Sequence, residues 1–457
     1  MKLLKVPHTL VLLFLMMIFA YGLTWILPAG KFDTVDSGGH QVIVPGSYKT
    51  IENAENLAPW ELFTVIPKAL GEASGIIFFL FIIGGSIAVL RSTGAIDAML
   101  GKVLKRFSHR PALLLFMSMS AFMIGSTSIG MAEEYIPLVL ILISLCVALK
   151  MDTVSAVGSM VIGYGIGYGT AVLNPFTVVV AQGVANVPPT SGWEFRLALF
   201  APFLAIGFHH LWSYAKKVRL DPTASLVHDV PEAQPPEPTD YPPMTGRRLG
   251  VLMVTLSALV LMVFGIAQFG WYFTELSAIF FALALVTTVI AGDTFDDAAK
   301  TFTVGASELT GTALLIGFAR SIEMILSDGQ VLHTVVDGLA TPLSQVGAEF
   351  SAVGMLFIQS ILNFFIPSGS GQAYVTMPIM APISDIVGVS RQVAVLAYQM
   401  GDGFMNMIVP TNAVLMGILG MCGIPYSRWF KFIAPLILKL FVAGSISLII
   451  AVLIGYQ

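Results

Sequence analysis

Long apolar stretches that are almost free of charged residues recur along the whole chain. A helix needs about 20 apolar residues to cross a hydrocarbon core about 30 Å thick. Hydropathy and helix breakers together predict nine crossings, near residues 9–28, 72–91, 153–187, 194–215, 249–268, 272–291, 306–327, 391–423 and 432–454. The pattern therefore predicts an all-α integral membrane protein with about nine transmembrane helices.

Four stretches carry polar breaks near their centres. Residues 153–187 and 391–423 are too long for single straight helices and contain Gly, Asn and Pro midway, so we expect two broken helices. Residues 111–149 and 350–385 also have a polar break, and each could enter the membrane and return. We therefore expect two re-entrant hairpins in addition to the crossings.

The positions of the basic residues give the orientation. Cytoplasmic loops carry an excess of Lys and Arg. With the N-terminus inside, the predicted outer segments hold only Lys31, Lys49, Lys68 and Arg391. The predicted inner segments hold Lys2, Lys5, Arg91, Lys102, Lys105, Arg106, Arg110, Lys150, Lys216, Lys217, Arg219, Arg247, Arg248, Lys300, Arg428 and Lys431. We expect a protein of the bacterial inner membrane with a cytoplasmic N-terminus and an outer C-terminus.

Composition agrees with a membrane protein. Of the 457 residues, 56% are hydrophobic and 11% are charged, whereas a soluble globular protein has about 25% charged residues. The net charge of −4 gives no support to nucleic-acid binding. Cys146 and Cys422 lie far apart in or beside apolar segments, so neither a disulfide framework nor a cysteine metal site is suggested.

The chain resembles itself at an offset of 235 to 242 residues. STSIG at 126–130 matches SGSGQ at 368–372, and NVPPTSGW at 186–193 matches GIPYSRW at 423–429. From the start of the helix near 72 to the start of the equivalent helix near 306, the chain makes five predicted crossings, counting the first helix, and five is an odd number. The copies must then have opposite orientations, as in the inverted-topology repeats of many secondary transporters.

These features divide the chain into four parts. The linker contains the run VPEAQPPEPTDYPP, whose composition indicates a flexible segment. The parts are a first transmembrane helix with an outer loop (1–59), a first inverted repeat with a hairpin and a broken helix (60–216), a cytoplasmic linker (217–247) and a second inverted repeat with a hairpin and a broken helix (248–457).

The predicted hairpin tips read IGSTSIGMAEEYIP and IPSGSGQAYVTMP. Non-helical backbone at membrane depth must be buried in protein or line a water-filled cavity. Its free carbonyls and amides, together with side-chain hydroxyls, suit Na⁺ or a substrate carboxylate; polar turns at the surface are the alternative. The candidate residues at the tips are Ser126, Thr127, Ser128, Ser368, Gly369 and Ser370.

The predicted breaks read GYGIGYGTAVLNPFT and GDGFMNMIVPTNAV. Half-helix ends at such breaks present their dipoles to an ion or a substrate. The candidates here and in the adjoining motifs are Asn174, Asn363, Gln372, Asn406, Thr411 and Asn412. Two Na⁺ sites are conceivable, at Ser126, Ser128 and Asn174 and at Ser368, Ser370 and Asn412. The glycines at 163, 165, 167 and 169 could equally serve close helix packing.

Ionisable residues at membrane depth are costly and are functional candidates by default. Glu133 and Glu134 adjoin the first tip, and Asp402 adjoins the second break. Glu134 and Asp402 have no basic neighbour in sequence, which favours binding of a cation, a proton or a substrate amine. Arg320 and Glu323 have helical i, i+3 spacing, so they form either a structural ion pair or a substrate contact.

Four motifs carry a family resemblance: GMAEEYIP at 130–137, NFFIPSGSGQAYVTMPIMAP at 363–382, GDGFMNMIVPTNAVLMGILG at 401–420 and IPYSRWFKF at 424–432. The chain resembles the YfcC family, relatives of arginine/ornithine antiporters and anaerobic C4-dicarboxylate carriers within the ion transporter superfamily. The resemblance implies a scaffold domain, a mobile transport domain, elevator motion and a homodimer. Superfamily carboxylate carriers place Na⁺ at Ser-Asn-Thr motifs, but both tips here lack the asparagine, so coupling to Na⁺, coupling to H⁺ and exchange all stay open.

We expect a secondary active transporter for a small charged metabolite rather than an enzyme. As substrate we favour a basic amino acid over a C4-dicarboxylate. A dianion would be repelled by Glu133, Glu134 and Asp402, and only Arg320 could offset this repulsion. An ion channel is the alternative, since VIGYG at 161–165 resembles a potassium-channel filter, but the other copy reads QMGDG. An intramembrane enzyme would need a motif such as HExxH or GxSxG, which the sequence lacks, and no cofactor is expected apart from a coupling ion.

Overall fold

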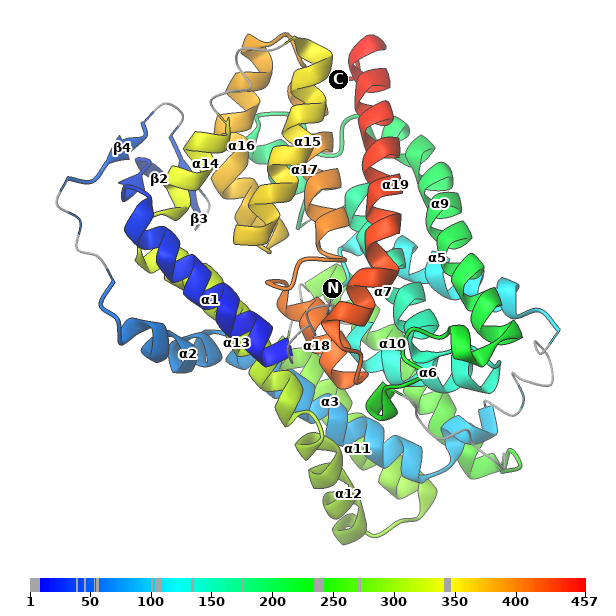
Figure 1. Ribbon diagram of the computed structural model, residues 1–457. Coiled ribbons are helices and arrows are strands. Elements are labelled where there is room, and N and C mark those ends of the chain that lie inside the picture. The colour runs from blue at the N-terminus through cyan, green and yellow to red at the C-terminus, as the bar shows by residue number, and fades with distance from the viewer. Residues whose placement is uncertain are drawn as a thin grey trace.

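The computed structural model describes residues 9–37, 40–44, 47–52, 54, 57–99, 102, 109–132, 135–174, 176–233, 242–269, 271, 273–340 and 347–457. Its architecture is almost entirely helical (Figure 1). The helices are α1 (Thr9–Ile26), α2 (Glu61–Glu72), α3 (Ser74–Ser92), α5 (Pro111–Ile129), α6 (Ile136–Ala148), α7 (Thr153–Gly169), α8 (Val178–Val184), α9 (Trp193–Leu220), α10 (Gly246–Phe269), α11 (Phe273–Ala291), α12 (Phe295–Ser307), α13 (Thr310–Asp328), α14 (Leu332–Ala340), α15 (Ala348–Phe365), α16 (Gly369–Ile386), α17 (Arg391–Met405), α18 (Ala413–Met421) and α19 (Tyr426–Leu453). Between α1 and α2, β1 (Gly30–Lys31) pairs with β4 (Lys49–Thr50), and β2 (Thr34–Ser37) pairs with β3 (His40–Ile43), both antiparallel.

Each apolar stretch that the sequence predicts to enter the membrane is helical in the described chain. The two broken stretches divide into α7 with α8 and α17 with α18, and the two hairpin stretches divide into α5 with α6 and α15 with α16. Among the described residues, five helices are long and apolar enough to cross a membrane, or six if α2 and Ile77–Ser92, bent by 56°, form one span. The five are Pro111–Ser128, Trp193–Leu220, Phe273–Ala291, Ala348–Phe365 and Tyr426–Leu453.

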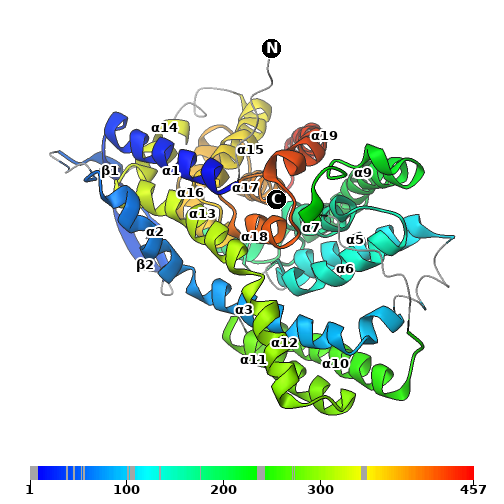
Figure 2. The ribbon, with the colours of Figure 1, turned by 60° about the horizontal axis from the view of Figure 1, so that its bottom comes forward.

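One group of helices consists of α1 to α3 and α10 to α13. Figure 2 shows α2, α3 and α10 to α13 along one side of the molecule. The amphipathic helices α2 and α12, which the sequence analysis did not predict, pack reciprocally: α2 lies on α13, and α12 lies on α3. Gly84 of α3 and Gly305 of α12 permit this contact, because a Cβ on Gly305 would lie 2.5 Å from the Gly84 carbonyl oxygen.

The second group, α5 to α9 with α15 to α19, surrounds the crossing of α7 and α17. Both helices are buried along almost their whole length. They touch through glycines: a Cβ on Gly403 would lie 2.2 Å from the Gly169 backbone nitrogen. A Cβ on Gly163 or on Gly167 would lie 2.7 Å from a backbone carbonyl oxygen of α5, and a Cβ on Gly165 would collide with the Met407 side chain. The glycine run therefore serves close helix packing.

The helices break where side chains replace backbone hydrogen bonds. Asn174 Oδ1 accepts hydrogen bonds from the amides of Phe176 and Thr177, just before α8. Asn412 is the N-cap of α18 and accepts from the Leu415 amide at 2.9 Å. Capping of this kind satisfies amides that a new helix leaves free, so α18 begins at an asparagine. Asn174 instead holds the turn before α8, whose N-cap is Thr177.

The described start of the predicted linker, residues 217–233, bonds to neighbouring helices, whereas residues 234–241 of the proline-rich run lie outside the described residues. Helix α9 continues to Leu220, and the chain that follows packs on the start of α7. Ser225 Oγ donates to Asp152 Oδ2 at 2.7 Å, and Thr153 Oγ1 donates to the Ala233 carbonyl at 2.5 Å. These bonds compensate the polar groups of the segment, which is why its polar composition does not prevent order.

The glycine crossing yields a stability prediction. We expect Gly403→Ala to destabilise the protein by about 1–3 kcal/mol, because the added methyl group would overpack against the backbone of α7. Gly183→Ala is the matched control, since nothing lies within 4 Å of its Cβ position. The apparent Tm of both variants in detergent, followed by tryptophan fluorescence, checks this. A Gly403→Ala variant as stable as the control would contradict the tight crossing.

Candidate functional site

A buried polar network lies where α15 and α16 meet the break between α17 and α18. We call its members Asn363, Gln372, Asp402, Asn406 and Asn412 the Asp402 cluster. Asp402 Oδ1 accepts from Asn363 Nδ2 at 2.9 Å and from Asn406 Nδ2 at 3.1 Å. Asn363 Nδ2 also lies 3.1 Å from Gln372 Oε1, and Asn412 Nδ2 donates to Asn406 Oδ1 at 2.8 Å. The structure therefore joins five predicted site residues in one network.

Helix ends hold the Asp402 cluster in place. Asn363 lies in the last turn of α15, and Gln372 lies in the first turn of α16. Asp402 lies in the last turn of α17, and Asn406 is the C-cap of this helix. The C-terminal end of a helix carries partial negative charge. A carboxylate in that position is unfavourable by itself and favours a nearby cation.

One oxygen of Asp402 is buried without compensation. Asp402 is 1% exposed, and its Oδ2 has no hydrogen-bond partner within the described part of the chain. The same holds there for Asn363 Oδ1, Gln399 Oε1 and Thr411 Oγ1. Buried polar atoms are normally paired, because an unpaired one loses its bonds to water without replacement. The second oxygen of this carboxylate is therefore a candidate contact for a proton donor or a cation.

The second tip approaches this free oxygen closely. A Cβ on Gly369 would lie 3.4 Å from Asp402 Oδ2 and 3.7 Å from Tyr398 Oη. Tyr398 donates to the Gly369 carbonyl at 2.6 Å, which fixes the tip against α17. The same Cβ position is 2.7 Å from a methyl group of Thr177, so the first break also reaches the site. Both halves of the chain thus contribute to the surroundings of Asp402.

The first tip and the first break bind each other instead. Asn174 Nδ2 donates to the Ser126 carbonyl at 3.0 Å, and the Val172 amide donates to Thr127 Oγ1 at 2.9 Å. The Leu173 amide donates to the Thr127 carbonyl at 3.0 Å. Asn174 Oδ1 accepts from the Phe176 and Thr177 amides, so both ends of this side-chain amide form internal bonds. The first half therefore forms a closed junction rather than an open polar site.

The remaining serine candidates have separate local roles. Ser128 Oγ donates to the Ile124 carbonyl of its own helix at 2.5 Å. Ser368 is the N-cap of α16 and accepts from the Gly371 amide at 3.4 Å, and Ser370 is half-buried in the first turn of α16. Thr411 is buried in the second break. The predicted Glu133 and Glu134 lie outside the described residues.

Arg320 lies in the other group of helices. It forms an ion pair with Glu323 of the same helix and a second one with Glu72 of α2, where N and O are 3.2 Å apart. The i, i+3 pair expected from the sequence is therefore present, and it also ties α13 to α2. In the described chain no hydrogen bond joins Arg320 to the Asp402 cluster.

Several polar residues of the site were missed in the sequence. Gln359 accepts from Gln372 Nε2 at 2.7 Å and from Thr376 Oγ1 at 3.1 Å. Gln359 precedes Asn363 by one helical turn, and Thr376 follows Gln372 by one turn. Polar side chains at i, i+4 within an apolar helix share a face. This spacing was the available signal.

A buried arginine was also missed. Arg196 of α9 is 0% exposed. Its Nη1 donates to Tyr456 Oη at 2.9 Å, and its Nη2 donates to the Ser191 carbonyl at 2.8 Å and the Val172 carbonyl at 3.4 Å. Arg196 thus ties the first break to the segments around α9 and the C-terminal residues.

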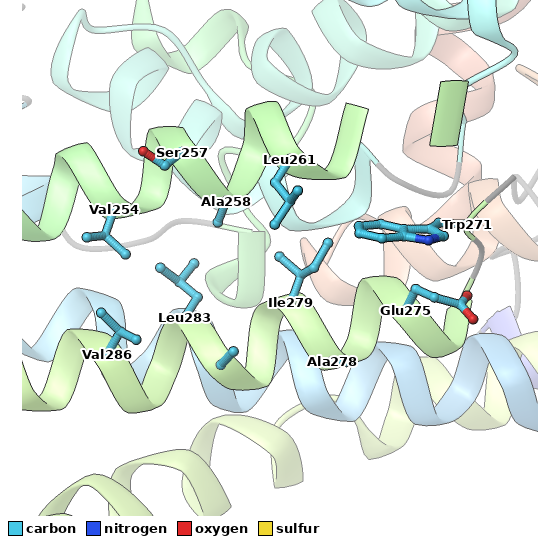
Figure 3. Close-up of a pocket in the computed structure, with 11 residues that line it drawn as sticks. Val254, Ser257, Ala258, Leu261, Trp271, Glu275, Ala278, Ile279, Leu283 and Val286 are labelled. Carbon is cyan, nitrogen blue, oxygen red and sulfur yellow. The ribbon is translucent and has the colours of Figure 1, made fainter. Parts of the chain in front are cut away.

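A wide groove lies apart from this network, between α10 and α11 (Figure 3). Its volume is about 510 Å³. Trp271 and Glu275 lie at one end, and the rest is lined mainly by aliphatic side chains such as Leu261 and Ile279. Such a surface suits lipid or another apolar surface better than a charged metabolite.

Comparison with known proteins identifies the family. The C4-dicarboxylate anaerobic carrier family matches residues 6–453. YfcC of Escherichia coli K12, provisionally named a basic amino acid antiporter, is 33% identical over 99% of this chain and 97% of its own length. An uncharacterized protein of Haemophilus influenzae is 29% identical, over 98% of this chain and 97% of its own.

Two solved transporter structures also align with the chain. The YdaH transporter of Alcanivorax borkumensis has a TM-score of 0.44 and 14% identity, covering 98% of this chain and 99% of its own. MtrF of Neisseria gonorrhoeae, described among antimetabolite efflux pumps, has a TM-score of 0.42 and 15% identity, covering 98% and 95%. The match over nearly the whole chain, together with the relative at 33% identity, confirms the resemblance to the YfcC proteins. The chain belongs to the C4-dicarboxylate anaerobic carrier family of membrane transporters.

Proposed function

We propose that this transporter is a secondary active carrier of a small charged metabolite and that Asp402 binds the cationic group that it carries. The free Oδ2 of Asp402, buried beside the second tip, is the observation that supports this most directly. A substrate amine, a Na⁺ ion or a proton would supply the missing partner. Each of these would also offset the negative end of α17.

A basic amino acid fits this site better than a dianion. The Asp402 cluster contains no Lys or Arg, and none of the ion pairs of the described chain involves a member of the cluster. A dicarboxylate beside Asp402 would meet a like charge in a low dielectric, which costs several kcal/mol. The name of the Escherichia coli relative points the same way. A C4-dicarboxylate is the second candidate, favoured by the description of the family.

The α-carboxylate of an amino acid would have a different partner. The first turn of α16, with Gly369 and Ser370, presents backbone amides at the positive end of a helix. It begins next to Asp402, so one substrate could span both ends. Ser368, Ser370 and Asn412 stay our candidates for a Na⁺ site. Ser126, Ser128 and Asn174 are the weaker set, because their side chains already form hydrogen bonds to nearby backbone carbonyls.

We further propose an inverted-repeat elevator in the bacterial inner membrane, working as a homodimer with an inner N-terminus and an outer C-terminus. The reciprocal packing of α2 on α13 and α12 on α3 supports two related copies. The separate group around α7 and α17 would be the mobile transport domain, and α1 to α3 with α10 to α13 would be the scaffold. The pairs α5 with α6 and α15 with α16 would be the re-entrant hairpins.

The central prediction concerns Asp402. We expect Asp402→Asn to lower exchange of labelled arginine or ornithine at least about 30-fold, since loss of one partner of a buried charge contact costs about 2 kcal/mol or more. Counterflow in proteoliposomes, with succinate tested in parallel, measures this. Asp293→Asn, at an exposed aspartate, is the matched control. Wild-type exchange by Asp402→Asn would remove this carboxylate from the transport site. Saturable succinate exchange without basic amino acid exchange would replace the proposed substrate.

A second prediction concerns the hairpins. In a chain without Cys146 and Cys422, we expect Arg110→Cys and Lys150→Cys to react with a membrane-impermeant maleimide from the cytoplasmic side only. We expect Glu349→Cys and Ile386→Cys to react from the outer side only. All four positions are exposed, and each lies at the end of its helix pair that is farther from the tip. Labelling of the two ends of one pair from opposite sides would mean that this pair crosses the membrane.

A further inference from the structure

A second cavity separates the pair α5 and α6 from α3 and α10. Its volume is about 400 Å³, and its walls include Leu90 of α3, Phe122 of α5, Leu142 of α6 and Leu256 of α10. The one polar lining residue is Thr255, whose hydroxyl donates to the Val251 carbonyl of its own helix. A charged metabolite would lose its hydration here without replacement, so this cavity is suited to hydrocarbon.

One end of this cavity is basic. Arg91 directly follows the lining residue Leu90, and Arg248 precedes the lining residue Leu252 by one helical turn, on the same face of α10. Lys102 is exposed to solvent and follows the lining residue Met99 by three residues. Asp97 is the acidic residue of the same segment, so positive charge prevails at this end.

The two arginines are held by neutral groups. Arg248 Nη1 donates to the Pro243 carbonyl at 2.8 Å, and its Nε donates to the Thr93 carbonyl at 3.3 Å. Arg91 Nη2 donates to Ser144 Oγ at 3.3 Å. Across the described ranges neither arginine has an ion-pair partner. Ser144 directly precedes the lining residue Leu145, so Arg91 is bonded beside the cavity wall, and Arg248 is bonded to the segment that follows Leu90.

From this arrangement we infer a binding site for an anionic phospholipid. An acyl chain would fill the apolar cavity, and the phosphate would lie against Arg91 and Arg248. Basic residues at a membrane surface favour binding of anionic lipid, and burial of an acyl chain in an apolar cavity favours it further. The two kinds of contact are arranged in the order in which a phospholipid presents its headgroup and chain.

The site would couple lipid to the arrangement of the helices. Its walls come from α6 on one side and from α3 and α10 on the other. A lipid that fills the cavity stabilises the relative position seen here and opposes any displacement that closes the space. Bound anionic lipid should therefore stabilise the full-length protein against heat, as any ligand of the folded state does.

The test uses the purified full-length protein in detergent, with dioleoylphosphatidylglycerol or dioleoylphosphatidylcholine added. Native mass spectrometry measures retained lipid, and tryptophan fluorescence gives the shift in Tm. We expect Arg248→Gln to weaken phosphatidylglycerol binding about fivefold and Arg91→Gln with Arg248→Gln about 25-fold, for about 1 kcal/mol per arginine. Phosphatidylcholine binding should not change in either variant.

Arg247→Gln is the matched control. It removes the same charge one residue away, but Arg247 donates to the Ala291 carbonyl of α11. We expect its lipid binding to stay within about twofold of wild type. Leu142→Phe, which narrows the cavity, should weaken both lipids. Equal losses in Arg247→Gln and Arg248→Gln would mean general surface attraction and would overturn the site. Equal binding of both lipids by wild type, or a disulfide-linked dimer formed by Leu256→Cys, would also overturn it.

Discussion

Backbone that leaves a helix inside a membrane must find its hydrogen bonds within the protein, and this constraint organises the second group of helices. Each broken helix meets the tip of its neighbouring helix pair. At the first junction the Val172 and Leu173 amides bind Thr127, and Asn174 binds Ser126. The glycine crossing of α7 and α17 brings the two junctions together at the centre of this group.

The two junctions solve the same problem with different results. In the first half, side chains and backbone groups of the tip and the break bond to one another. In the second half, the network contains a carboxylate. Asp402 Oδ1 accepts hydrogen bonds from Asn363 and Asn406, and Asp402 Oδ2 has no hydrogen-bond partner among the described residues. This asymmetry between the halves is what gives the transporter a candidate place for a cationic group.

The other group of helices has a different character. Its internal contacts rely on apolar surfaces, on the close approach of Gly84 and Gly305, and on the ion pairs of Arg320 with Glu72 and Glu323. Two carboxylates share one guanidinium there, and all three side chains are held by one another. The apolar cavity beside α10 lies between this group and the first helix pair, so the proposed lipid would contact both.

The sequence by itself determined the membrane class, the helical stretches, the two breaks and every member of the Asp402 cluster. These features depend on local patterns: apolar runs, Gly and Pro within them, and short polar motifs. The tertiary structure decided which polar atoms are satisfied, because their partners are remote; Arg320 binds Glu72 across 248 residues, and Thr177 reaches the second tip. It also decided that residues 221–233 pack on α7, since their order depends on bonds to Asp152 and Thr153 that composition does not reveal.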